Sequence, residues 1–65
     1  MSKTYEAMLD QRRSLINRID SLVATGVKLW QIKELEELRE LFTGDWYYIS
    51  NEEFLEFARK NWENF

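Results

Sequence analysis

The segment FTGDWYYISNEEFLEF, residues 42–57, limits more than any other stretch how this chain can fold. Ser50 is followed three positions later by Glu53, which is the spacing of a capping box at the start of a helix. Ile49 and Phe54 occupy the two positions of a hydrophobic staple around the same cap. The segment therefore predicts a helix that begins at Ser50, so any earlier helix must end before the aromatic run.

Two glycines predict where the earlier helices end. Gly26 fits the position just after a helix in a Schellman motif, in which Val27 contacts Leu22. Gly44 fits the same left-handed backbone conformation after a second helix. We predict a single helical domain over residues 1–65, with helices at about 4–24, 28–42 and 50–63.

Apolar residues recur every three or four positions in each predicted helix, which is the pattern of one buried face. In the first helix they are Tyr5, Met8, Leu9, Leu15, Ile16, Ile19, Leu22 and Val23. In the second they are Leu29, Ile32, Leu35, Leu38, Leu41 and Phe42, and in the third Phe54, Phe57, Ala58, Trp62 and Phe65. We predict an all-α fold, a small three-helix fold in which an antiparallel helical hairpin is crossed by a third helix.

Two side chains do not fit these stripes. Arg12 stands where the first helix needs an apolar residue, and we expect its stem to lie along the core while its guanidinium reaches water. An ion pair with another helix or a contact with a partner are the alternatives. Trp30 is only two positions from Ile32, so it is either the flank of a wide core face or an exposed anchor.

The composition argues against enzymes and metal proteins. The chain has no cysteine and no histidine, which removes disulfides, thiolate metal sites and the commonest catalytic base. The carboxylate pairs Glu36/Glu40 and Glu52/Glu56 lie on helix faces predicted to be exposed, where nothing raises a carboxyl pKa. We predict a non-enzymatic protein with no cofactor and no small-molecule substrate.

Ile49, Glu53 and Phe54 resemble the exit half of an EF-hand, which implies a bidentate calcium ligand at Glu53. The resemblance covers about a quarter of the chain. Counting back from Glu53, the first and fifth loop positions are Phe42 and Trp46, which have no side-chain oxygen. We therefore predict no metal.

The sequence also gives an expected location. Its first residues, MSKTYEAMLDQ, lack the apolar segment of a signal peptide, and no uncharged apolar run approaches the roughly 18 residues of a membrane helix. The absence of cysteine favours a reducing compartment. We expect a soluble cytoplasmic protein that does not bind membranes, and one small enough for a partner to help stabilise it.

The aromatic residues predict an interaction surface. Eight of the ten aromatics fall within residues 42–65, more ring surface than a thin bundle encloses, and exposed Trp and Tyr often anchor interfaces. We predict a protein-protein interaction module that binds or inhibits a larger protein, or self-associates as a homodimer. The predicted contact residues are Trp30, Trp46, Tyr47, Tyr48 and Arg12. Compact acidic chains of this kind fit a phage or plasmid accessory protein.

Charge is unevenly distributed and suggests an alternative function. Residues 1–33 carry six basic and three acidic groups, net +3, whereas residues 34–65 carry three basic and nine acidic groups, net −6. We expect the two halves to pack with complementary charge. The alternative is a transcriptional regulator that binds nucleic acid through Arg12, Arg13 and Arg18 in the basic half. The third helix is a poor DNA reader, because it begins SNEEFLEF, with carboxylates where phosphates would lie.

Overall fold

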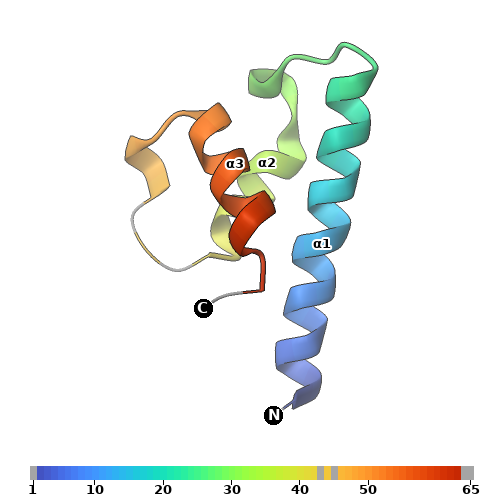
Figure 1. Ribbon diagram of the computed structural model, residues 1–65, viewed down its shortest axis with the longest axis vertical. Coiled ribbons are helices and arrows are strands. Elements are labelled where there is room, and N and C mark those ends of the chain that lie inside the picture. Colours follow the sequence, from blue (N-terminus) through green and yellow to red (C-terminus); the bar gives the residue numbers. More distant parts are fainter. Residues whose placement is uncertain (1, 43, 45, 64–65) are drawn as a thin grey trace.

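A computed structural model describes residues 2–42, 44 and 46–63 of the chain. Within these residues the structure is entirely helical and has no strand, which confirms the predicted all-α, three-helix class. In order, the elements are α1 (Ser2–Ala24), the 3₁₀ helix η1 (Leu29–Gln31), α2 (Lys33–Glu40), the 3₁₀ helix η2 (Trp46–Tyr48) and α3 (Asn51–Asn61). α2 returns antiparallel to α1, and both α2 and α3 pack against α1 (Figure 1).

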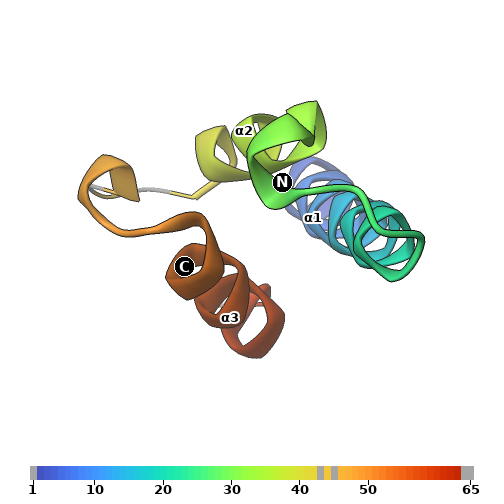
Figure 2. The same ribbon diagram turned by 90° about the horizontal axis from the view of Figure 1, so that it is seen from above.

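The core lies between the three helices, which form the corners of a triangle when seen from above (Figure 2). The side chains that are fully enclosed are Ile19 from α1, Leu38 from α2, and Phe54 and Ala58 from α3. The remaining buried apolar residues surround them, and they are Leu15, Ile16, Ile32, Leu35, Phe42 and Leu55. Most of the apolar positions predicted from the helical spacing therefore meet in one cluster.

The turn after α1 is the predicted Schellman motif. Gly26 has a φ of +98°, in the left-handed region that glycine adopts without a steric penalty. The amide of Val27 donates to the carbonyl of Leu22 at 3.0 Å, and the amide of Gly26 donates to the carbonyl of Val23 at 3.0 Å. These bonds satisfy the last carbonyls of α1 and reverse the chain.

The second helix differs from the prediction of one helix over residues 28–42. The chain forms η1, passes through Ile32 in an extended conformation (φ −92°, ψ 109°), and only then enters α2 at Lys33. The break resolves the conflict in spacing between Trp30 and Ile32, because it turns Ile32 into the core, 5% exposed, and leaves Trp30 outside. α2 also ends early, at Glu40, and the next residues form a turn of 3₁₀-type hydrogen bonds.

Arg39 organises the connection between α2 and α3. Its guanidinium donates to the carbonyls of Trp46 and Ile49, the latter at 3.1 Å, and to the Asn51 side-chain oxygen at 3.0 Å. The connection contains the 3₁₀ helix η2, and a carbonyl from this helix and one from the residue after it converge on the guanidinium. Thr43, where the predicted connection begins, lies outside the described residues.

The start of α3 confirms the predicted capping box. The amide of Glu53 donates to Ser50 Oγ at 3.1 Å, and the amide of Ser50 donates to Glu53 Oε1 at 3.3 Å. Ile49 packs, half-buried, against the core cluster that contains Phe54. α3 ends at Asn61, and Phe65, predicted to extend its apolar face, lies outside the described residues.

Two ion pairs join the two halves of the chain, and only Arg18–Glu34 pairs a base of the first half with an acid of the second, as expected. Arg59 Nη2 of α3 lies 2.5 Å from Asp20 Oδ1 of α1, and Arg18 Nη1 of α1 lies 3.6 Å from Glu34 Oε2 of α2. Because the Arg59–Asp20 side chains are about two-fifths exposed and Arg18 is more so, each pair stabilises the fold only slightly.

Replacing Ser50 by alanine is expected to destabilise the protein by about 1 kcal/mol, because the Glu53 amide loses its cap. Thermal unfolding followed by circular dichroism should show a melting temperature lower by roughly 4–8 °C. Ser14→Ala is the matched control, since Ser14 lies exposed in the middle of α1. Equal melting temperatures for the two variants would contradict the capping role.

Candidate interaction surface

Arg12 lies inside the fold. Its side chain is 1% exposed, so the expectation that its guanidinium reaches water is wrong. Nε and Nη2 donate to the carbonyl of Leu41, at 3.3 and 2.7 Å, and Nη1 donates to the carbonyl of Trp62 at 2.8 Å. Cζ lies 4.1 Å from the centre of the Phe42 ring. In contrast to its predicted role in a contact surface, Arg12 is not accessible to a partner.

The position of Arg12 has an electrostatic cause. Leu41 and Trp62 are the C-terminal caps of α2 and α3, and the last carbonyls of a helix lack partners and carry the negative end of the helix dipole. One guanidinium bridges both helix ends. Burial lowers the pKa of Arg12 from its ordinary value, since desolvation disfavours the charged form, and the charge interaction with Tyr5 opposes this change.

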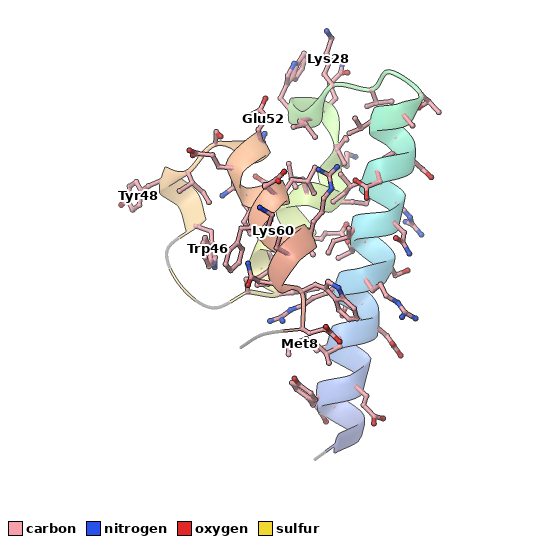
Figure 3. The ribbon with its side chains drawn as sticks, in the orientation of Figure 1. Met8, Lys28, Trp46, Tyr48, Glu52 and Lys60 are labelled. Atoms are coloured by element: carbon pink, nitrogen blue, oxygen red, sulfur yellow. The ribbon has the colours of Figure 1, made fainter. Side chains whose placement is uncertain are left out.

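Trp46 is also directed inward. Its ring centre lies 4.2 Å from that of Phe57 and 6.0 Å from that of Phe54, and the side chain is half-buried. Tyr48, two residues later, points away from the body of the protein (Figure 3) and is 85% exposed. The side chain of Tyr47 lies outside the described part of the chain. Only Tyr48 among the described aromatics of this run is therefore available as a surface anchor.

Among the described side chains, Trp30 is the other strongly exposed aromatic residue, at 75%. It belongs to η1, and Figure 1 shows η1 and η2 on opposite sides of the first turn of α3. The structure thus does not bring Trp30, Trp46 and Tyr48 together as one surface. It separates an exposed tryptophan on η1 from an exposed tyrosine on η2, whereas Trp46 packs against the core.

A groove of about 540 Å³ runs beside Trp30, where η1, α2 and the start of α3 meet. We call it the Trp30 groove, and its principal lining residues are Leu29, Trp30, Ile32, Leu35, Glu36 and Glu40. Ile32 and Leu35 are buried and form an apolar floor, whereas Glu36 and Glu40 are exposed. The groove could not be predicted from the sequence, because it depends on the break at Ile32. The two-residue spacing between Trp30 and Ile32 was the only sign of that break.

The basic residues of the nucleic-acid alternative are dispersed. Arg12 is buried, while Arg13 and Arg18 are exposed. Five positions separate the latter two, which places them roughly 140° apart around α1. Arg18 pairs with Glu34, and the Arg13 guanidinium lies 5.8 Å from the centre of the Trp62 ring. The three arginines therefore do not form one basic face.

Comparisons with known proteins add no assignment: no family model, curated protein sequence or solved structure matches this chain. Among the described residues, no helix combines the length and the apolar character needed to cross a membrane. The same residues hold no cluster of three or more acidic, histidine or cysteine side chains placed to bind a metal ion.

Proposed function

We propose that this chain is a small, non-enzymatic protein-interaction module that binds a partner protein through Trp30 and the groove beside it. The exposure of Trp30, 75%, is the observation that carries the proposal. The core is closed without this indole, so packing within the chain does not account for it. Tryptophan is among the residue types that contribute most to binding energy when a partner buries them.

The partner is either a larger protein, which the module would regulate or inhibit, or a second copy of the chain. Either kind of partner would bind at the same surface. The exposed indole needs an apolar recess on the partner molecule, and in a dimer the apolar floor of the second copy's Trp30 groove offers one. We place the module in the cytoplasm, which the absence of cysteine supports.

Trp30→Ala is expected to abolish partner binding, whereas Tyr48→Ala, at an equally exposed aromatic on the other side of α3, is expected to retain it. Both substitutions are at the surface and should change stability by no more than about 0.5 kcal/mol. The test uses the tagged wild-type chain and both variants as bait in a lysate of the source cells. Light scattering across protein concentrations follows self-association of the same three proteins.

The expected result is a captured protein, or a dimer, that is present with wild type and Tyr48→Ala and absent with Trp30→Ala. If all three proteins are monomers at every concentration and capture the same set of proteins, the proposed function is wrong. The nucleic-acid alternative is less well supported, because only Arg13 and Arg18 of its three arginines lie at the surface.

A further inference from the structure

We infer that the segment bound in the Trp30 groove is basic and inserts an arginine or lysine side chain between the Trp30 indole and the carboxylates of α2. This inference rests on the proposed interaction function and specifies the chemistry of the partner. Two independent features of the groove, an unengaged ring and unpaired acids, are complementary to the same group, a cation on a partly apolar chain.

The first feature is the ring of Trp30. Indole attracts cations more strongly than the other aromatic side chains do. The arginines in contact with rings in the described structure are Arg12, Arg13 and Arg39, and they lie over Phe42, Trp62 and Phe54. Trp30 has no cation over either face in the same set of residues, so its ring is available to one from outside.

The second feature is a pair of carboxylates one turn apart. Glu36 and Glu40 both line the groove and both are exposed, and like charges at this spacing repel each other. The acids that form ion pairs within the described residues are Asp20, Glu34 and Glu56. A guanidinium or ammonium group held in the groove beside Glu36 and Glu40 would reduce that repulsion.

The positive groups near the groove do not satisfy these acids. Lys33 lines the groove but forms no ion pair among the described residues. Arg39 lines the groove, but its guanidinium is directed to the carbonyls of Trp46 and Ile49 and to Asn51. Lys28, at the same end of the molecule, extends away from the body (Figure 3).

The lining residues carry an excess of negative charge. Three glutamates, Glu36, Glu37 and Glu40, stand against Lys33 and Arg39, which gives a net charge of −1. The whole chain, these residues included, carries a net charge of −3, so an acidic segment would be repelled at long range and a basic one attracted. The apolar floor of Ile32 and Leu35 favours a segment that also carries an aliphatic residue.

The test measures binding of synthetic peptides to the full chain. Peptides of equal length repeat one of four units, Arg-Leu-Gly, Lys-Leu-Gly, Gln-Leu-Gly or Glu-Leu-Gly, so that apolar content is constant and only charge changes. Binding is followed by the indole N–H signal of Trp30 in two-dimensional nitrogen-correlated NMR spectra. Trp30→Phe identifies that signal by its loss.

The arginine and lysine peptides should shift the Trp30 signal and bind about tenfold more tightly than the glutamine peptide at low salt, with the glutamate peptide weakest. The preference should diminish as salt is raised to physiological strength. The double variant Glu36→Gln/Glu40→Gln should reduce the binding of the basic peptides to that of the glutamine peptide. A matched double variant, Glu6→Gln/Asp10→Asn, removes the same charge from exposed positions one turn apart on α1, outside the groove, and should keep most of the preference.

Equal binding of all four peptides with a shifted Trp30 signal would overturn the basic partner and leave the groove as a docking site. A preference for basic peptides that survives Glu36→Gln/Glu40→Gln would also overturn it, because the attraction would then be nonspecific. No shift of the Trp30 signal by any peptide would overturn it as well. The lysate and light-scattering results decide the proposed function separately.

Discussion

Replacing Arg12 by alanine is expected to leave the protein largely unfolded. The carbonyls of Leu41 and Trp62 would lose their donor while remaining at the ends of α2 and α3, and Phe42 would lose the cation over its ring. Loss of one partner from a buried charged network costs about 3–5 kcal/mol. A core of this size supplies rarely more than about 3–5 kcal/mol, so little stability would remain. Urea unfolding followed by circular dichroism measures the change.

Two further variants separate the hydrogen bonds of Arg12 to the two carbonyls from the effect of its positive charge. Arg12→Lys keeps the positive charge but lacks the planar fork that reaches both carbonyls and stacks on Phe42, so we expect it to fall well below wild type. Arg18→Ala removes an exposed arginine from the same helix and should change stability by no more than about 0.5 kcal/mol. If Arg12→Ala were as stable as Arg18→Ala, the bridging role of Arg12 would be excluded.

The features that the sequence predicted correctly are local ones. The capping box at Ser50 and the glycine turn at Gly26 each depend on residues within a few positions of one another, and their hydrogen bonds form without reference to the rest of the fold. The helical spacing of apolar residues likewise predicts which face is buried. These signals were enough for the fold class, because short connections leave few ways to pack three helices.

The role of Arg12 could not be predicted in the same way. Its partners are main-chain carbonyls 29 and 50 positions away, and every residue has a carbonyl. The sequence therefore contains no residue type that marks them. Only the packing of α2 and α3 brings Leu41 and Trp62 to the same point of α1. A gap in the apolar stripe indicated that Arg12 was unusual without indicating what it contacts.

The candidate surface was predicted only in part. The number of rings suggested that several would be exposed, but a ring can pack edge-on against others, and Trp46 does so with Phe42, at an interplanar angle of 78°. Trp30 was identified because it is too close in sequence to Ile32 for both to lie on one narrow apolar face. It could therefore flank a wide core or be exposed, and the break before α2 leaves it exposed. The groove beside it is a product of that break and has no residue pattern of its own.

The second large effect is expected for Phe54→Ala. Phe54 is fully buried. The centre of its ring lies 5.7 Å from the ring centre of Phe42 and 6.0 Å from that of Trp46. The Arg39 guanidinium lies 4.7 Å from the centre of the Phe54 ring. Removing it leaves a cavity where α2, η2 and α3 meet, at an expected loss of about 3–5 kcal/mol. Urea unfolding measures the loss. The tryptophan emission, to which Trp46 contributes together with Trp30 and Trp62, should shift to the red because the Trp46 indole loses a buried neighbour.

Two comparisons test whether the cavity causes this loss. Phe54→Leu keeps most of the volume and should cost less than about 1.5 kcal/mol, although it removes the ring from Phe42, Trp46 and Arg39. Phe57→Ala, at a half-buried position three residues later on the same helix, should fall between the two Phe54 variants. If Phe54→Leu lowered the free energy of unfolding as much as Phe54→Ala, the filled volume would not explain the loss. Ring contacts would then hold the start of α3 against α2, with Arg39 over the Phe54 ring as the main stabilising contact.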